Sequence, residues 1–157
     1  MILYLDTSAL VKLFFRETGS NFVVDLVAKA DSVITSQVAY AESCSALARR
    51  KRDKRLTRDE FETAKRNLDE MWPQMDTVLI DEIKAGELAI KHIIRGFDAI
   101  HLAAALELRT SGDAPLDVTF CSFDDRQNEA ARAEDLTVVR REQDELHSDK
   151  EHERPMI

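Results

Sequence analysis

The stretch ILYLDTSAL, residues 2–10, decides the fold class because it joins a strand pattern to a helix pattern with one acid between them. Residues 2–5 form a short apolar run with a β-branched residue and an aromatic, which is typical of a buried strand. Asp6 comes next, and the residues SALVKLFFR then favour a helix. The same order of strand and helix recurs along the rest of the chain.

Four further strands and six further helices are predicted from hydrophobic periodicity. The strand candidates are SVIT (32–35), DTVLI (76–80), DVTFCSF (117–123) and LTVVR (136–140). Helix patterns cover residues 21–30, 36–51, 58–72, 82–95, 95 to about 111, and 125–134. Strands separated by helices of about ten residues require crossover connections. We therefore predict α/β structure: a single doubly wound domain with a parallel sheet of four to five strands flanked by helices.

Local signals mark some helix ends. Thr57 with Glu60 three residues later is a capping box, and Ser36 is the N-cap expected for the helix over 36–51. Gly96 is the glycine expected to stop the helix over 82–95. The polar composition after Arg141 predicts that residues 1–141 form the domain and residues 142–157 a flexible C-terminal tail.

The composition bounds the class of protein. With 157 residues, 44% hydrophobic and 33% charged, the chain is expected to be a folded globular domain rather than a disordered segment. No apolar run approaches the roughly 20 residues of a membrane span. The start lacks the basic region and cleavage site of a signal peptide. Cys44 and Cys121 are expected to be buried reduced thiols, so a cytoplasmic location without membrane contact is predicted.

Acids occur directly after the predicted strands. Asp6 and the pair Asp124 and Asp125 come at strand ends, and Glu42 and Asp98 lie on helices that leave the same side of a parallel sheet. Ligands of open α/β sheets bind at the carboxyl ends of the strands. We therefore expect these carboxylates to share one pocket, although each acid alone could be a helix cap or a solvated helix residue.

Carboxylates gathered in one pocket repel one another unless a cation neutralises them. Their hard oxygens suit Mg²⁺ or Mn²⁺, and such an ion can activate water for phosphodiester hydrolysis. His101 could ligate the ion, transfer protons or hold a carboxylate, and the last role is favoured. Thr7 and Ser8 are expected to cap the first helix, or to place a hydroxyl near the ion.

The segments LDTSALVKLFFRETGS (5–20), AYAESCSALARR (39–50), RGFDAIHLAAAL (95–106) and TFCSFDDRQNEAA (119–131) resemble the PIN-domain ribonucleases. The resemblance is to toxins of the VapC type from toxin–antitoxin pairs, and it covers about residues 2–140. It implies a Mg²⁺- or Mn²⁺-dependent endoribonuclease with Asp6, Glu42, Asp98 and Asp124 as catalytic and metal-binding carboxylates. Thr7, His101 and Asp125 would support them. The implied partners are RNA, a cognate antitoxin and a second copy of the chain.

Two positions depart from the resemblance: Gln127 stands where an apolar residue is usual, and Asp135 replaces a common glycine. Both put the local packing in doubt. Several apolar residues exceed the expected needs of one core, and they are expected to form a homodimer face or an antitoxin groove; these are Phe14, Phe15, Phe22, Leu47 and Phe61.

The net charge of −8 argues against binding of nucleic acid through the overall field, but the stretch over 48–58 is strongly basic. This stretch is either a solvated face that complements a helix end or a ridge for RNA phosphates. The residues expected to contact RNA are Arg49, Arg50, Arg52, Lys54 and Arg55.

Two rival functions fit the same pattern. A metal-dependent phosphatase would use Asp6 as nucleophile, but one such class needs a second acid two residues later, where this chain has Ser8. A non-catalytic α/β module that binds RNA or protein would keep the fold without the chemistry.

Overall fold

A five-stranded parallel sheet organises the protein, in the order β3-β2-β1-β4-β5. The computed structural model describes residues 1–139, so the predicted boundary at 141 and the predicted tail over 142–157 lie outside the described residues. The strands are β1 (Ile2–Leu5), β2 (Ser32–Ser36), β3 (Asp76–Val78), β4 (Val118–Cys121) and β5 (Thr137–Val138). All four strand pairings are parallel, which confirms the predicted doubly wound class.

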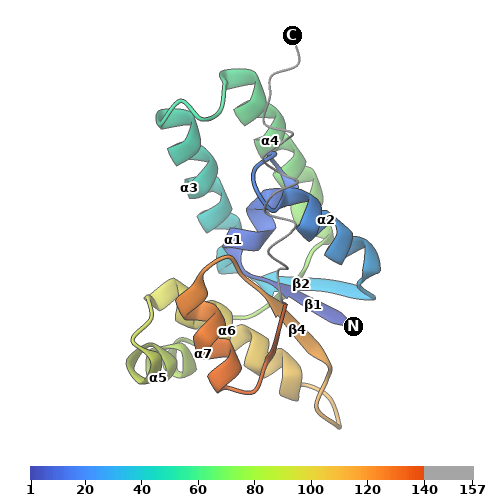
Figure 1. The fold of residues 1–157 in the computed structure, drawn as a ribbon, viewed down its shortest axis with the longest axis vertical. Helices are drawn as coiled ribbons and strands as arrows, with labels where there is room; N and C mark the ends of the chain where they lie inside the picture. Colours follow the sequence, from blue (N-terminus) through green and yellow to red (C-terminus); the bar gives the residue numbers. More distant parts are fainter. Residues whose placement is uncertain (140–157) are drawn as a thin grey trace.

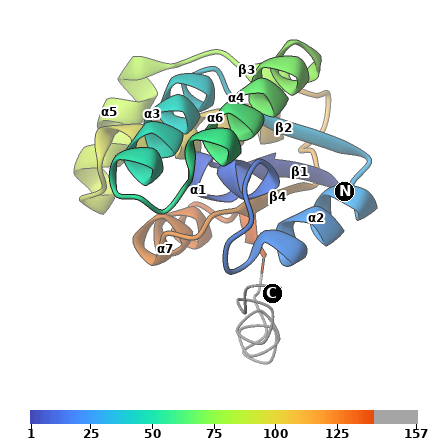
Figure 2. The same cartoon turned by 90° about the horizontal axis from the view of Figure 1, so that it is seen from above.

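Helices cover both faces of the sheet (Figure 1). One face carries α1 (Thr7–Leu10), the 3₁₀ turn η1 (Val11–Leu13), α2 (Ser20–Lys29), α3 (Val38–Arg52), α4 (Arg58–Met71) and the 3₁₀ turn η2 (Trp72–Gln74). The other face carries α5 (Glu82–His92), α6 (Gly96–Thr110) and α7 (Asp125–Ala133). Figure 2 shows α3 and α4 running side by side. None of the described helices combines the length and the apolar character that a membrane span needs.

The central strand β1 feeds two separate cores because its side chains alternate between the faces of the sheet. Tyr4 packs with α5, α6 and α7, stacking on Phe120 with ring centroids 5.6 Å apart. Leu3 and Leu5 pack with the first four helices. All three β1 side chains are fully buried, so this strand fixes the position of Asp6 at the carboxyl edge of the sheet.

The predicted helix ends are partly confirmed. The capping box at Thr57 and Glu60 is present, with the Glu60 amide donating to Thr57 Oγ1 at 3.2 Å and the Thr57 amide donating to Glu60 Oε2 at 2.7 Å. Ser36 is not the N-cap of α3; it ends β2, and Gln37 holds the cap position. The helix predicted over 8–16 is shorter, with α1 passing into η1.

Gly96 does not stop α5, contrary to prediction. The helix ends at His92, and Ile93 takes the left-handed conformation with φ 53°, while Gly96 opens α6. A β-branched residue rarely adopts this conformation, which costs about 1–2 kcal/mol. After the earlier stop, Ile94 is partly buried and packs against the core that includes α5.

The apolar residues assigned to a partner face are core residues instead. Phe14 and Leu47 are buried in the core beneath α1–α4, and Phe15, Phe22 and Phe61 pack against it. The sequence does not show this because α4 stands off the sheet and needs its own apolar partners. Of the two cysteines expected to be buried, Cys121 is buried, whereas Cys44 is partly exposed.

Candidate active site

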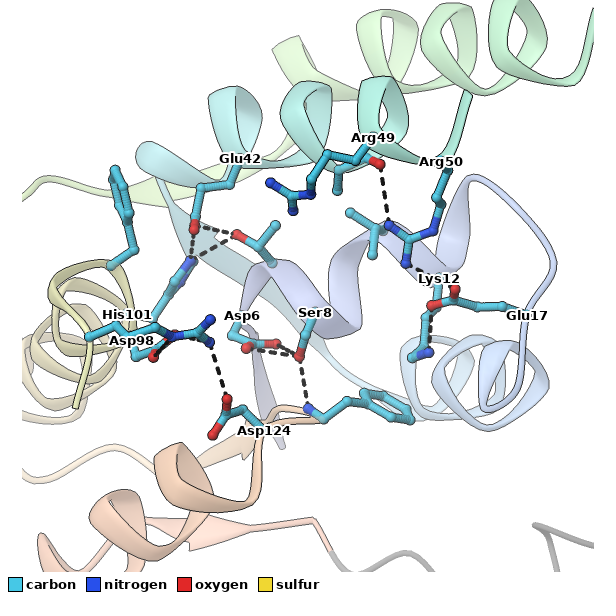
Figure 3. Close-up of a pocket in the computed structure, with 16 residues that line it drawn as sticks. Asp6, Ser8, Lys12, Glu17, Glu42, Arg49, Arg50, Asp98, His101 and Asp124 are labelled. Carbon is cyan, nitrogen blue, oxygen red and sulfur yellow. Dashed lines mark hydrogen bonds and ion pairs between the residues drawn. The ribbon is translucent and has the colours of Figure 1, made fainter. Parts of the chain in front are cut away.

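A pocket of about 520 Å³ opens at the carboxyl edge of the sheet. Figure 3 shows that its lining has two ends, with the labelled acids Asp6, Asp98 and Asp124 at one end and Lys12, Glu17 and Arg50 at the other. Glu42 and Arg49 face the same space from α3. The four predicted carboxylates therefore line one pocket, as the strand ends predict.

Asp6 is placed by the register of β1 and β4. Leu5 pairs with Cys121, so the next residues of both strands, Asp6 and Ser122, are neighbours. The Ser122 hydroxyl lies 2.8 Å from Asp6 Oδ2, and the Ala9 amide donates to Oδ1 at 2.9 Å, which makes Asp6 the N-cap of α1. The Ser8 hydroxyl also donates to this carboxylate, at 2.7 Å.

Burial raises the pKa of the Asp6 carboxyl, and the nearby His101 and the hydrogen bonds from Ser8, Ala9 and Ser122 oppose this rise only in part. Because burial disfavours the charged form of this carboxyl, which is 4% exposed, a cation beside it would stabilise that form. The position of Asp6 therefore favours a positively charged occupant of the pocket.

Asp98 and Asp124 come together across the pocket, although they are on different helices. Arg95 joins them: its Nε donates to Asp98 Oδ2 at 2.7 Å, and its Nη2 donates to Asp98 Oδ1 at 3.2 Å and to Asp124 Oδ2 at 3.1 Å. Asp124 also caps α7 by accepting from the Gln127 amide at 3.1 Å. One cationic group thus fits between these two carboxylates.

Sequence reasoning missed Arg95 as a site residue. Its side chain is 77% exposed and still makes both ion pairs. The available signal was an arginine three residues before an acid at a helix start, a spacing at which side chains meet. The contact with Asp124 carried no such signal, because it depends on how α6 and α7 pack.

Glu42 is held by a hydrogen-bonded chain that begins in the core. Tyr4 Oη lies 3.0 Å from His101 Nδ1, and His101 Nε2 lies 2.9 Å from Glu42 Oε2. Thr7 Oγ1 donates to the same Glu42 oxygen at 2.6 Å. Because the Glu42 carboxylate can only accept, His101 donates to it from Nε2. Burial raises the pKa of the Tyr4 hydroxyl well above its ordinary value, so Tyr4 keeps its proton beside Nδ1.

This chain explains the charge state of Glu42. Burial alone would raise the pKa of its carboxyl, but the hydrogen bonds from His101 and Thr7 hold it below the ordinary value. Thr7 and His101 line the pocket beside Glu42, a position that is consistent with the predicted role in supporting the acids. Asp125 is exposed and does not line the pocket, so its supporting role stays a prediction.

The donors in the pocket suit a hard divalent cation that keeps much of its water. All four acids offer carboxylate oxygens, and Asp98 and Asp124 already bracket a cation. Within residues 1–139, however, no three Asp, Glu, His or Cys side chains converge closely enough to enclose an ion. Mg²⁺ is commonly bound by one or two carboxylates with waters and substrate phosphate completing its shell, and these residues fit that arrangement.

The basic stretch divides into two parts. Arg49 and Arg50 line the pocket, and Arg50 is restrained by Glu17 at 2.9 Å and by the ring of Phe15. The remaining cations predicted to contact RNA, Arg52, Lys54 and Arg55, are exposed beyond the pocket, at the end of α3 and in the turn after it.

Comparisons with known proteins agree with this architecture. The PIN domain family matches residues 3–133. Ribonuclease VapC45 of Mycobacterium tuberculosis (strain CDC 1551 / Oshkosh) is 39% identical over 114 residues, covering 71% of this chain and 79% of the relative.

Solved structures share the fold at lower identity. FitAcB from Neisseria gonorrhoeae is 18% identical with a TM-score of 0.61, covering 89% of this chain and 97% of that one. VapBC2 from Rickettsia felis, solved with a DNA fragment from its promoter, is 16% identical with a TM-score of 0.59, covering 88% and 98%. With the match over residues 3–133 and the 39% identical relative, the chain belongs to the PIN-domain family, in its VapC group.

Proposed function

We propose that this protein is a metal-dependent endoribonuclease, the toxin of a toxin–antitoxin pair, that hydrolyses RNA phosphodiester bonds. One observation carries the proposal: Asp98 and Asp124 bracket a cationic group in the pocket that also holds Asp6 and Glu42. The similarity to a relative named as a ribonuclease supports RNA as the substrate. A cytoplasmic location is part of the proposal, since Cys44 and Cys121 are expected to be reduced thiols, which suit a reducing compartment.

The four acids of the pocket have different proposed roles. Asp98 and Asp124 would hold Mg²⁺ or Mn²⁺ with Asp6 behind them, and the bound ion would lower the pKa of a water and stabilise the leaving oxygen. Both hydrogen bonds to Glu42 end on Oε2, which leaves Oε1 to accept a proton from water at the pocket. His101 and Thr7 keep Glu42 charged for that task.

The test is cleavage of a mixed RNA pool by the purified protein with Mn²⁺ or with EDTA, and then mapping of the new ends. Cleavage in Mn²⁺ that stops in EDTA is the expected result. A phosphatase would instead release inorganic phosphate from monoesters. It would need Asp6 as an accessible nucleophile, but both Asp6 oxygens accept hydrogen bonds and the residue is buried.

Arg49 and Arg50 provide the proposed contact to the RNA backbone, with the exposed cations of the turn extending it. Of the two, Arg49 is the more exposed, and it lines the pocket beside the acids. We expect R49A to weaken RNA binding and to reduce the slope of log affinity against log salt by about 0.7, the value for one phosphate contact on a single strand. The control R52A should change the slope less. An unaltered slope in R49A would contradict the contact.

An antitoxin is the proposed partner that restrains the pocket. Arg95 shows that a guanidinium satisfies Asp98 and Asp124 together, so an arginine from a partner could neutralise the same acids. A second pocket lies between η1 and α4. Phe14 and Phe15 pack in or against the core, but their remaining exposed atoms line this pocket with Leu56, and they would offer an apolar anchor for the partner chain.

A second copy of the chain is proposed to pack on the outer face of α5. Ile83, Ile90 and Ile93 are 72%, 83% and 84% exposed, and together they form one apolar stripe. Gly86 lies between them in sequence, and a Cβ added there would meet nothing within 4 Å, so packing inside the chain does not require glycine. A glycine within an apolar stripe allows another helix to approach closely.

Replacing Ile90 with Glu is therefore expected to convert a dimer to a monomer, because the charge would be buried in the apolar contact. Analytical ultracentrifugation over a range of concentrations measures the change. The matched control is V24E, since Val24 is an exposed apolar residue of α2, distant from this stripe. A wild-type protein that sediments as a monomer at all concentrations refutes the interface.

A further inference from the structure

Gln127 is a polar residue at a position where an apolar one is expected, and its side chain is completely buried. Its Nε2 donates to the Asp98 carbonyl at 3.0 Å, and the Ser122 hydroxyl lies 2.8 Å from its Oε1. Its backbone amide donates to Asp124 Oδ1 at 3.1 Å. Burying an amide is unfavourable unless its hydrogen bonds are made, and here both ends of the amide are bonded.

These bonds tie together the elements that carry the acids. The Asp98 carbonyl belongs to the first turn of α6, Ser122 comes directly after β4, and Gln127 lies in the first turn of α7. Each of these elements delivers one side of the acidic end of the pocket. The amide therefore sets the spacing between the start of α6 and the end of β4, on which the distance between Asp98 and Asp124 depends.

Ser122 adds a second consequence. Its hydroxyl lies 2.8 Å from Asp6 Oδ2 and 2.8 Å from Gln127 Oε1, and it accepts from the Asp124 amide at 3.0 Å. One hydroxyl has a single proton, so it donates to either Asp6 or Gln127 at any moment. When a cation takes Asp6 Oδ2, the hydroxyl can turn to Gln127 and stay bonded.

We propose that Gln127 is a positioning residue for the divalent ion: it spaces Asp98 against Asp124 and accepts the Ser122 proton when Asp6 binds the cation. The proposal rests on the proposed function only for the presence of a metal, not for the cleavage of RNA. An apolar residue at position 127 could not make the hydrogen bonds to the Asp98 carbonyl and the Ser122 hydroxyl.

The informative variant is Gln127→Met, which keeps the length and volume of the side chain. Without a cation, Ser122 still has Asp6 as acceptor, and the variant loses the two hydrogen bonds of the Gln127 amide. Thermal unfolding in EDTA measures the effect of that loss on stability separately from metal binding. With a cation on Asp6, the Ser122 hydroxyl of the variant keeps only the more distant Ser8 Oγ, 3.4 Å away, as an alternative acceptor. The dissociation constant for Mn²⁺ is then expected to rise about tenfold, the effect typical of groups that orient metal ligands.

The matched control is Asn128→Ala on the same helix turn. Asn128 Nδ2 donates to the Ser122 carbonyl at 3.0 Å, and the backbone amide that Asn128 donates to the Asp124 carbonyl is kept in the variant. The loss of this side chain should therefore lower the melting temperature and leave Mn²⁺ affinity unchanged. Calorimetric titration of the full chain with Mn²⁺, together with thermal unfolding in EDTA, separates the two effects. In the background of Ser122→Ala, Gln127→Met should weaken Mn²⁺ binding by a smaller factor.

Equal Mn²⁺ affinity in wild type and Gln127→Met overturns the proposal, as does weaker binding that matches a loss of folded protein. Wild-type protein without Mn²⁺ affinity overturns it too. Protein that binds Mn²⁺ in the pocket but cuts no RNA contradicts the proposed function instead, and the comparison of Gln127→Met with wild type still stands.

Discussion

Replacing Asp98 with Asn is expected to lower the rate of RNA cleavage by at least about 100-fold, because one of the two carboxylates that bracket the cation loses its charge. Asn keeps the shape of Asp, and the side chain of Asp98 bonds only to the exposed Arg95 among the described contacts. Exposed ion pairs contribute about 0–1 kcal/mol, so the fold should persist.

Cleavage of the RNA pool and the Mn²⁺-induced rise in melting temperature measure this effect together. A saturating ligand at about 100 times its dissociation constant adds about 2.7 kcal/mol of stability, and this gain should vanish in Asp98→Asn. Asp59→Asn is the control, because Asp59 is also an acid in the first turn of a helix but lies outside the pocket. An Asp98→Asn protein that cleaves RNA at the wild-type rate would remove the basis of the assignment.

Glu17→Gln is expected to destabilise the fold by about 3 kcal/mol, which is the usual effect of removing one partner from a buried ion pair. Glu17 is 17% exposed and pairs with Lys12 at 2.6 Å and Arg50 at 2.9 Å. Lys12 is itself buried and lies over the ring of Phe123. Without Glu17, two cations would face each other with little solvent around them.

The ion pairs of Glu17 with Lys12 and Arg50 also make the stability of the fold depend on pH. Burial raises the pKa of the Glu17 carboxyl, but the hydrogen bonds from Lys12 and Arg50 outweigh it and hold the pKa below its ordinary value. A carboxyl with a lowered folded pKa stabilises the protein above its unfolded pKa, and this contribution is lost as the pH falls through the folded value. Wild type should therefore lose stability in acid more steeply than Glu17→Gln.

Chemical denaturation at neutral pH and in acid, at about pH 3, below the ordinary pKa of a glutamate, measures both effects. The control is Asp53→Asn, since Asp53 pairs with Arg52 at 2.8 Å at an exposed site, where the loss of an ion pair has little effect on stability. Equal stability of Glu17→Gln and wild type at neutral pH would show that the ion pairs of Glu17 with Lys12 and Arg50 do not stabilise the fold.

The alternation of strands and helices was predictable because periodicity is a local property of the chain. Residues 2–5, 32–35 and 117–123 mark strands that the structure contains, with ends that differ by a few residues. Errors arose where tertiary packing overrides a local signal. Ile93 takes the left-handed turn that Gly96 was expected to provide, and Ile94 then packs against the core.

The candidate site was also predictable only in part. Asp6, Glu42, Asp98 and Asp124 could be assigned to one pocket from the sequence, because parallel strands end at one edge and bring the next residues of the chain to that edge. The distances among them could not be assigned. Among the described residues, no three of these acids lie close enough together to enclose an ion. Their separation depends on how α3, α6 and α7 pack.

By itself the sequence determined the α/β class, the order of the acids along the chain and the chemistry of their oxygens, since all three depend on residue type and short-range spacing. Only the tertiary structure decided that Arg95 bridges Asp98 and Asp124, that Gln127 ties α7 to the start of α6, and that Tyr4 reaches Glu42 through His101. These contacts join residues about 30 to 100 positions apart, and their formation depends on side-chain packing across elements, which no local pattern encodes.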